Sequence, residues 1–445
     1  MLLPLLLTAS TAMATPSFPP IQYKHRVLPN GLEVYSIRDG ATPTVAIHVW
    51  YRVGSKHDPE GRSGFAHLFE HIMFKSTKNM PAEMLDRLTE DVGGFNNATT
   101  LDDATAYYEV VPSNYLETLL WAEAERLGSL NVDEANFKSE RDVVKEEFRF
   151  RILAPPYGQL FYAIEKQSFT RHPYRRPGIG SIEELDAATI EDVQKFHATY
   201  YRPDNAVLIV AGDFDQEQLD GWVDKYFTPI PKPDIPLPDV NVPEPARKES
   251  RRVTEYAPNV PLPAVAMTWL VPEASHADAA ALSIVASILA EGESGRLQEK
   301  LVRGEISQEV FATPDLREDL GLFSIVSVMG GDHQPAEAEK VIWSELNDLV
   351  AEPIAAAELQ KVKNLMLTHA LRERETANGK AFSLGVALIL EKDAAAVNSG
   401  LAKLQAVTAE DVSRVVKKYF LEGKAVTIEY FDESSRPAAP AGGVQ

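Results

Sequence analysis

The sequence repeats itself at an interval of about half its length, and this duplication limits the fold more than any other feature. Thr408 lies 219 positions after Thr189 (408 − 189), and Ala425 lies 219 positions after Ala206 (425 − 206). Three pairs of segments match in the same order: residues 45–50 (VAIHVW) with 265–269 (VAMTW), 189–193 (TIEDV) with 408–412 (TAEDV), and 206–210 (AVLIV) with 425–429 (AVTIE). We therefore expect two related domains of similar size.

A proline-rich run separates the two copies. It begins at Pro229 and reads PIPKPDIPLPDVNVPEP, and prolines at this density are incompatible with helices and central strands. We expect residues 229–248 to form an extended, semi-rigid linker. This linker would separate an N-terminal domain of residues 15–228 from a C-terminal domain of residues 249–433. The Pro/Ala/Gly-rich tail at 434–445 is expected to be disordered.

Each copy combines strands and helices without a regular βαβ alternation. In the first copy, apolar β-rich segments at 31–37 and 44–53 are followed by helical patterns at 114–127 and 134–150. Each copy then ends with a helix, marked by the repeated Thr-x-Glu-Asp, and with a strand. We therefore predict an α+β fold with two homologous domains, each a mostly antiparallel sheet with helices packed on it.

The overall composition argues against some classes of function. The chain carries 65 acidic and 44 basic residues, a net charge of −21, whereas nucleic-acid-binding proteins normally have a basic face. We therefore expect no nucleic-acid partner. The acidic balance is only weak evidence for a basic substrate, because acidic surfaces also keep proteins soluble. The chain has no cysteine, so any metal ion must be held by His, Asp or Glu.

The first residues are similar to an export signal. Residues 2–7 are almost all apolar, and Ala12-Met13-Ala14 fits the small-x-small pattern of a cleavage site, although no Lys or Arg precedes the apolar run. We interpret residues 1–14 as a signal peptide, which predicts a periplasmic or secreted protein; a cytosolic protein with an apolar start is the alternative. No later segment approaches about 20 uninterrupted apolar residues, so no membrane span is expected.

The residues with the clearest chemical meaning are His67, Glu70 and His71, in the segment HLFEH. Ser63 can cap a helix here, and the apolar residues of the segment favour one. On a helix the two histidines lie one turn apart on the same side and can hold one metal ion. Glu70 reaches the same space and can take a proton from water at the metal. This H-x-x-E-H order is a signature of zinc hydrolases, although a short motif can also arise by chance.

A catalytic zinc ion usually has three protein ligands and one open position, so a third ligand must come from another element. Residues 140–147 (ERDVVKEE) supply candidates on a second predicted helix. Glu140 and Glu147 are two turns apart and therefore share one face of that helix. Most acidic side chains on a helix surface only face solvent, and the pattern by itself leaves Glu146 and Glu147 as alternatives.

These motifs together resemble the pitrilysin family of zinc peptidases, which includes insulin-degrading enzymes and mitochondrial processing peptidases. The H-x-x-E-H motif is followed by E-R-x-V-V-x-x-E at 140–147, and residues 93–99 (GGFNNAT) are similar to the first seven positions of the family's G-G-x-x-N-A-x-T. Residues 201–206 (YRPDNA) and 212–213 (GD) match its Y-x-P-x-N…G-D segment. The resemblance covers nearly the whole mature chain.

The resemblance implies roles for several further residues. Glu147 would be the third zinc ligand, and Glu140 would support the ligands without contacting the metal. The strand that contains Asn97 and Ala98 would be an edge strand, to which a substrate peptide adds as a further strand. The two related domains would pair around a substrate chamber.

The second copy has lost the motif, because the positions 219 residues after His67, Glu70 and His71 hold Ala286, Leu289 and Ala290. One copy is therefore expected to carry out the chemistry, and the other is expected to close over the substrate.

Active members of the family often carry, in the second half, an arginine followed seven residues later by a tyrosine, and both contact substrate. Here Arg303 is present, but Val310 occupies the position of the tyrosine. We therefore hypothesise a heterodimer with a homologous chain that lacks zinc ligands and supplies an Arg/Tyr pair. A homodimer is the alternative.

These features together predict a zinc-dependent endopeptidase that acts on extended peptides or unfolded segments. Zn²⁺ would be bound by His67, His71 and Glu147, and Glu70 would act as the general base. The alternatives are a non-catalytic assembly subunit, like the family's respiratory-complex core proteins, and a metal-dependent hydrolase of small molecules. The intact motif argues against the first alternative, and the edge strand in a large two-domain design favours peptides over small molecules.

Overall fold

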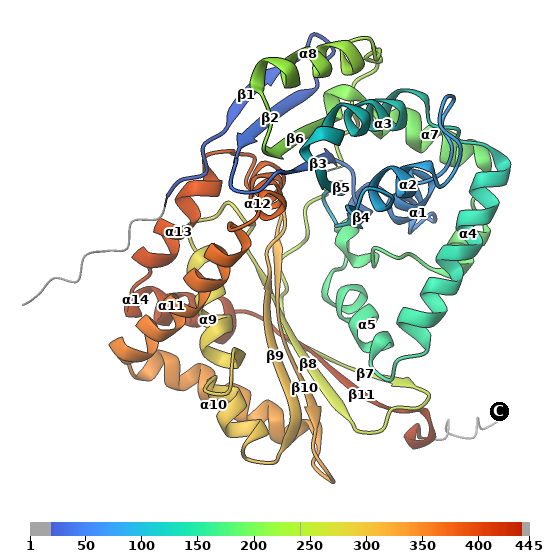
Figure 1. Cartoon of the computed structure of the whole chain (residues 1–445). Coiled ribbons are helices and arrows are strands. Elements are labelled where there is room, and N and C mark those ends of the chain that lie inside the picture. Colours follow the sequence, from blue (N-terminus) through green and yellow to red (C-terminus); the bar gives the residue numbers. More distant parts are fainter. Residues whose placement is uncertain (1–18, 241, 438–445) are drawn as a thin grey trace, which may run out of the picture.

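The computed structural model describes residues 19–240 and 242–437, and its two sheets lie one in each half of the chain (Figure 1). This arrangement confirms the predicted α+β fold with a duplicated architecture. The predicted signal peptide, residues 1–14, lies outside the described residues. Within the described part of the chain, no helix has the length and apolar character that crossing a membrane requires.

The N-terminal half contains a six-stranded sheet with the strand order β1-β2-β6-β3-β5-β4. All neighbouring strands are antiparallel except β2 and β6, which are parallel. β4 therefore lies at one edge of the sheet and pairs only with β5. The strands are β1 (Lys24–Val27), β2 (Glu33–Arg38), β3 (Thr44–Tyr51), β4 (Phe95–Thr100), β5 (Thr105–Pro112) and β6 (Ala206–Gly212).

The C-terminal half contains a five-stranded sheet with the order β7-β11-β8-β10-β9, in which only β7 and β11 are parallel. Without β1, the first sheet has the same arrangement. The repeated segments occupy equivalent strands, β3 with β8 and β6 with β11, so the duplication in the sequence is a duplication of the sheet. The strands are β7 (Arg251–Ala257), β8 (Ala264–Val271), β9 (Ser307–Asp315), β10 (Gly321–Met329) and β11 (Val426–Asp432).

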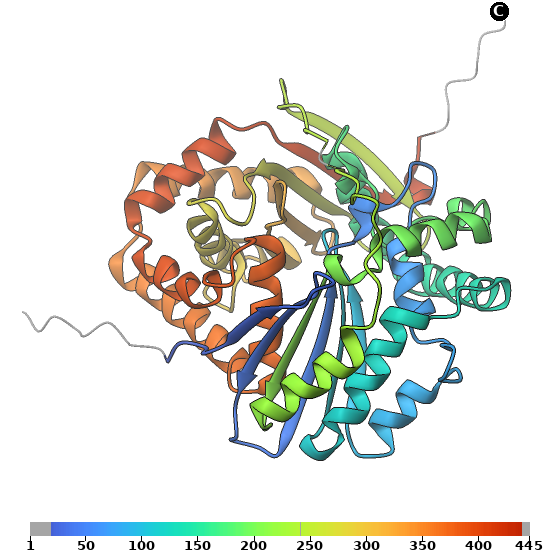
Figure 2. The same cartoon turned by 90° about the horizontal axis from the view of Figure 1, so that it is seen from above.

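The helices surround the two sheets (Figures 1 and 2). The N-terminal half contributes α1 (Phe65–Ile72), α2 (Met84–Glu90), α3 (Leu116–Ser129), α4 (Glu134–Phe148), α5 (Gly158–Ser168), α6 (Ile182–Asp186), α7 (Ile190–Tyr200) and α8 (Gln216–Phe227). The C-terminal half contributes α9 (Ala279–Ala290), α10 (Pro335–Ala351), α11 (Ala356–Glu373), α12 (Ala377–Leu390), α13 (Ala396–Ala406) and α14 (Ala409–Val416). The repeated Thr189 and Thr408 cap α7 and α14 through equivalent capping boxes.

One face of each sheet is covered by helices of its own half. Along β3, Val45, Ile47 and Val49 point into a core shared with α1, α3, α7 and α8. Trp50 belongs to a different core, because neighbouring residues of a strand face opposite sides of the sheet. The equivalent core of the C-terminal half lies between its sheet and α9, α10, α11 and α14.

The other face of each sheet is covered by a helix from the opposite half. α12 of the C-terminal half packs on β2, β3 and β6, where Leu384 and Leu388 join Trp50 and Ile209 in one apolar core. α5 of the N-terminal half packs on β7, β8 and β11 in the same way. The sequence analysis assigned these helices to their own domains and did not predict this exchange. Both halves are consequently held together by continuous apolar cores.

The contact between α12 and the N-terminal sheet requires a glycine. A Cβ atom added at Gly385 would lie 2.2 Å from Cε2 of the buried Trp50 ring, which is far inside van der Waals contact. Gly400 of α13 provides a contrast, because a Cβ atom there would meet no heavy atom within 4 Å.

We predict that Gly385→Ala lowers the free energy of unfolding by about 1–3 kcal/mol, because the ring or the helix must shift. Gly400→Ala should instead raise it by about 0.5–1 kcal/mol, because alanine is the better helix former. Denaturant unfolding of both variants measures this difference. Equal effects of the two substitutions would contradict the proposed contact.

The predicted linker contains no helix or strand in its described residues and lies against the N-terminal half. Arg202 donates hydrogen bonds of 2.8 Å to the carbonyls of Pro233 and Ile235. The Glu244 carboxylate accepts the backbone N–H groups of residues 170–172. The linker is thus fixed at several places along its length, and its Arg247 also donates to backbone carbonyls of both halves.

Ordered structure continues past residue 434, the predicted start of the disordered tail. Glu433–Ser435 form a 3₁₀ turn, in which the Asp432 carboxylate accepts the Ser434 N–H at 2.9 Å. Arg436 pairs with Glu433. This difference arises because side-chain caps stabilise the turn locally. Residues 438–445 lie outside the described residues.

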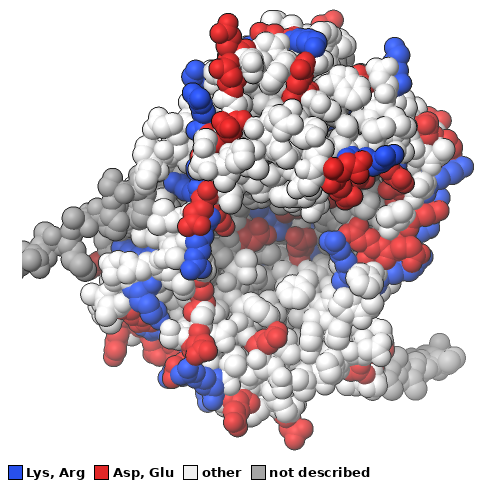
Figure 3. Space-filling view, viewed as in Figure 1, with Lys and Arg blue, Asp and Glu red and all other residues white. Residues whose placement is uncertain are grey.

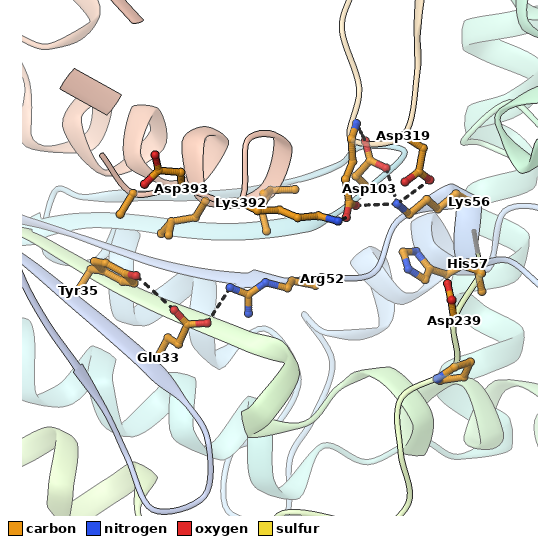
Figure 4. A pocket seen from close by; sticks show the side chains of 16 residues that line it. Glu33, Tyr35, Arg52, Lys56, His57, Asp103, Asp239, Asp319, Lys392 and Asp393 are labelled. Carbon is orange, nitrogen blue, oxygen red and sulfur yellow. Dashed lines mark hydrogen bonds and ion pairs between the residues drawn. The ribbon is translucent and has the colours of Figure 1, made fainter. Parts of the chain in front are cut away.

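A cavity of about 570 Å³ lies where the two halves meet, and Figure 4 shows the charged side chains on its walls. Lys56 is buried there, with its Nζ atom 2.9 Å from Asp103 of its own half. The same atom lies 2.6 Å from Glu318 and 3.1 Å from Asp319 of the C-terminal half. Lys392 also contacts Glu318, at 2.6 Å, but 69% of its side chain is exposed. Among the Lys and Arg residues that line this cavity, Lys56 is therefore the buried one that pairs with carboxylates of both halves.

We predict that Lys56→Met lowers the free energy of unfolding by about 3–5 kcal/mol, because it leaves the buried Asp103 carboxylate without its cation. Lys392→Met, the matched exposed control, should cost only about 0–1 kcal/mol. Denaturant unfolding of both variants measures these losses, provided that the m-value does not change. A loss at Lys56 no larger than that at Lys392 would contradict a stabilising role for the buried cluster.

Candidate active site

The helix that carries the H-x-x-E-H motif is held by a cap from outside its own segment. α1 begins at Phe65, and Gly64 precedes it in a left-handed conformation with a φ of 91°. The Asp58 carboxylate accepts the N–H groups of Gly64 at 2.6 Å and Ala66 at 2.9 Å. The sequence analysis favoured Ser63 as the cap, and this was wrong, because a buried aspartate from a preceding turn satisfies these donors instead.

The two faces of α1 have different surroundings. Phe65, Leu68, Phe69 and Ile72 are buried in the N-terminal core, and Phe69 stacks on Phe196 of α7. The opposite face carries the three motif residues toward α4 and β4. The apolar side of the helix therefore orients its polar side.

His67, His71 and Glu147 converge on one point. Nε2 of His71 lies 3.1 Å from Oε2 of Glu147, and Nε2 of His67 lies 3.6 Å from the same oxygen. One possible ligand atom from each residue lies within 4.8 Å of the others. Glu146 points away, is largely exposed and pairs with Arg149. Between the two alternatives of the sequence pattern, the structure brings Glu147 to the histidines.

Glu140 lies behind His71 on the same face of α4. One of its oxygens is 3.7 Å from Nδ1 of His71, and the other is 2.7 Å from Nζ of Lys75. A carboxylate at Nδ1 favours the tautomer that leaves Nε2 free to bind a metal ion. Glu140 therefore orients His71 and is not one of the three candidate metal ligands.

Glu70 faces the edge strand β4. Its Oε2 atom accepts a hydrogen bond of 2.5 Å from the Thr100 hydroxyl. Burial raises the pKa of Glu70, and the Thr100 hydrogen bond opposes this shift. Glu70 is therefore fixed beside the three candidate ligands, with a carboxylate that accepts a proton more readily than an exposed one.

The three candidate ligands and Glu70 line a cavity of about 620 Å³ together with the strand β4. Asn97 is exposed on this strand, and Ala98 packs into the N-terminal core. The outer edge of β4 pairs with no other strand among the described residues. Figure 3 shows a hollow between the two halves, with charged side chains on its walls.

Arg303 lies apart from this cavity. It follows a short helical turn of the C-terminal half and pairs with Glu293 at 3.4 Å and with Glu299 at 3.6 Å. Val310, seven residues later, is buried in the C-terminal core. Arg303 is therefore the predicted site residue that lies away from the candidate active site.

Four residues that the sequence analysis did not single out also line the cavity: Phe74, Thr100, Tyr108 and Arg151. Arg151 follows Glu147 by four residues, a spacing that places two side chains on the same helix face. This spacing could have identified Arg151. Tyr108 is opposite Asn97 in the β4–β5 pairing, which only the strand register reveals.

A second group of acids, Asp102, Glu165 and Asp315, also comes close together. Arg317 lies among them and pairs with all three carboxylates. The guanidinium group occupies the position in which a cation would balance these charges. This group is therefore an internal ion-pair cluster.

The pKa values of the two histidines are shifted in opposite directions. Burial lowers the pKa of His67 to about 4, and the neighbouring His71 contributes to this shift. Burial also acts against protonation of His71, but the neighbouring carboxylates of Glu140 and Glu147 outweigh it and raise the pKa of His71 to about 9. Without a cation, His71 is therefore protonated at neutral pH and His67 is not.

We predict that zinc binding near neutral pH releases about one proton, because the ion must replace the proton of His71. The affinity for zinc should consequently rise with pH until it levels off near pH 9, the pKa of His71. Calorimetric titrations in buffers of different ionisation enthalpy measure the released protons. Glu140→Gln should reduce the release, because it removes one of the groups that hold this proton. A release close to zero in the unmodified protein would contradict the prediction.

Comparisons with known proteins agree with the motifs. Residues 33–152 match the family model described as Insulinase (Peptidase family M16), and residues 187–366 match the model described as Peptidase M16 inactive domain. The zinc protease PqqE of Helicobacter pylori is 31% identical over 430 residues, which cover 95% of this chain and 96% of that protein. The probable mitochondrial-processing peptidase subunit beta of Arabidopsis thaliana is 24% identical over 404 residues, covering 89% of this chain and 76% of that protein.

The similarity extends to the three-dimensional structure. The crystal structure of a protease from Helicobacter pylori matches with a TM-score of 0.89 and 29% sequence identity, covering 93% of this chain and 100% of that chain. The family model described as an inactive domain covers most of the C-terminal half. In this half, Ala286, Leu289 and Ala290 stand at the positions equivalent to the three motif residues.

Proposed function

Because this chain belongs to the peptidase M16 family, as its pitrilysin-like motifs indicated, we propose that it is a zinc-dependent endopeptidase acting on extended peptides or unfolded segments. The observation that carries this proposal is the convergence of His67, His71 and Glu147 beside Glu70 in a cavity next to an edge strand. Zinc peptidases need this combination of three ligands and a proton acceptor.

The residues of the site fit a zinc ion. Two imidazoles and one carboxylate form a donor set that catalytic zinc sites use, and they leave a position open on the cavity side. A bound Zn²⁺ would act as a Lewis acid on the scissile carbonyl and make water acidic enough to attack near neutral pH.

Glu70 supports the proton transfers of peptide hydrolysis. Its carboxylate would accept a proton from the attacking water and later give it to the nitrogen of the leaving amine. Burial raises the pKa of Glu70, which favours both steps near neutral pH. The Thr100 hydroxyl holds one carboxylate oxygen and leaves the other available.

The edge strand β4 provides a binding surface for the peptide. An extended peptide that pairs with β4 would make main-chain hydrogen bonds that do not depend on its sequence. Its scissile bond would then pass His67, His71 and Glu70, which line the same cavity as Asn97 and Thr100. Folded proteins should be poor substrates, because their strands are already paired.

We further propose that a second, homologous chain completes the enzyme. Arg303 lies outside the cavity and Val310 is buried, so this chain offers no Arg/Tyr pair to the substrate. A relative named as a peptidase subunit supports a heterodimer, and a homodimer is the alternative. The apolar start of the chain supports a periplasmic or secreted location, which fractionation of cells would test.

The second candidate function is a non-catalytic subunit, which the match to an inactive-domain model favours for the C-terminal half. The intact ligand set of the N-terminal half favours the enzyme.

We predict that Glu70→Gln retains zinc but lowers kcat/KM for unstructured peptides by about 10²–10⁴-fold, because it removes the proton acceptor. Glu147→Gln should lose zinc, whereas Glu146→Gln, its neighbour on the exposed side of α4, should retain both zinc and activity. Metal analysis and fluorogenic peptide assays test the three variants. Activity that survives in Glu70→Gln would contradict the proposal.

The same assay tests the assembly. Full activity of the purified chain alone would argue against the heterodimer. Activity that appears only after co-expression with a homologous chain would support it, and zinc binding without activity in either form would favour the non-catalytic subunit.

A further inference from the structure

We propose that Arg151 selects peptides that carry an acidic side chain next to the scissile bond. This inference rests on the proposed peptidase function and specifies its substrates. It comes from the position and surroundings of one side chain in the candidate active site.

Arg151 is placed at the site by the helix that carries Glu147. α4 continues without interruption into a short π-helical turn, Arg149–Leu153, so the two residues lie four positions apart on one face. Nε of Arg151 lies 3.0 Å from Oε1 of Glu147. The side chain lines the same cavity as the β4 residues from Asn97 to Thr100.

A divalent cation bound at the three candidate ligands would leave Arg151 without a full counterion. Glu70 and Glu147 are the carboxylates that line it, and Arg151 is the single Lys or Arg among the described lining residues. When a divalent cation is bound, the two carboxylates balance its charge. Arg151 then contributes a positive charge that a peptide carboxylate could neutralise.

The guanidinium group also has free donors on the cavity side. Arginine carries five N–H groups in a planar fork, and the contact with Glu147 uses the Nε edge. The side chain is 70% exposed, so its terminal nitrogens are accessible. A carboxylate of the peptide can bind such a fork through two parallel hydrogen bonds. A neutral amide on the peptide could not accept both of these bonds, and a lysine in place of Arg151 could not donate both of them.

The strand geometry limits which peptide residue can reach Arg151. Successive side chains of an extended peptide on β4 point to opposite sides. Only alternate residues can therefore face the guanidinium group. The preference for Glu or Asp should appear at one position, or at positions two residues apart, and not at adjacent positions.

A purely structural role for Arg151 makes a different prediction. If the side chain only holds Glu147 in place, its removal should weaken zinc binding and lower the cleavage of all peptides by the same factor. A role in recognition should instead change the ratio between peptides that differ in charge.

Arg149 provides a matched control. It lies in the same π-helical turn, but it pairs with Glu146 on the outer side of α4 and does not line the cavity. Arg149→Gln removes the same charge from the same helix without touching the site.

The test uses peptide sets in which each position around the cleaved bond holds Glu, Gln or Lys. We expect the unmodified enzyme to favour Glu over Gln by about tenfold in kcat/KM at one position, the size of one charged hydrogen bond. Arg151→Gln should reduce this ratio to about one, and Arg151→Glu should reverse it in favour of Lys. Arg149→Gln should keep the original ratio, and zinc content is measured for every variant.

Binding measurements separate this inference from the proposed function. Glu70→Gln, with and without Arg151→Gln, is titrated with labelled Glu and Gln peptides, so that the preference is measured without turnover. A failure of every form to cleave would contradict the peptidase proposal, and a Glu preference in binding that depends on Arg151 would still support this inference. A Glu/Gln ratio of about one in the unmodified protein, or an equal loss for all peptides in Arg151→Gln, would overturn it.

Discussion

Each sheet of this protein buries its second face against a helix from the other half, and the rest of the structure depends on this exchange. β6 and most of β3 are buried on both sides, so their apolar residues need a layer above and a layer below. α12 supplies the missing layer for the first sheet, and α5 supplies it for the second. The halves cannot separate without exposing both cores to water, which is unfavourable in proportion to the apolar area. The packing of these two cores therefore sets how the halves are placed on either side of the hollow.

The candidate active site uses this rigid frame. α5 follows the helix that carries Glu147, and its packing on the C-terminal sheet fixes the far end of that segment. α1 is fixed by its apolar face and by the Asp58 cap. Charged groups can remain close together here because each has a partner: Lys75 with Glu140, Arg151 with Glu147, and Thr100 with Glu70. Partnered polar groups avoid the desolvation cost that isolated buried charges would carry.

Much of this arrangement could be predicted from the sequence pattern. The duplication follows from the 219-residue offset between matching segments, and the strands at 45–50 and 265–269 follow from apolar, β-rich runs. The placement of His67, Glu70 and His71 on one helix follows from the helical period of 3.6 residues. Glu140 and Glu147 share a face of α4 for the same reason. Spacing did not distinguish Glu147 from its neighbour Glu146, because both lie in the last turns of one helix and only the position of α1 decides which of them meets the histidines.

The sequence by itself determined the two-copy architecture, through its repeat at 219 residues, and the groups that can hold a metal ion, because backbone geometry fixes which residues of a helix share a face. The tertiary structure alone decided which helix covers which sheet, that Asp58 rather than Ser63 caps α1, that Arg303 lies away from the cavity and that Arg151 lies within it. These outcomes depend on contacts between segments far apart in the chain. Such contacts are set by the burial of apolar faces and by the pairing of polar groups, and no local pattern of residues records them.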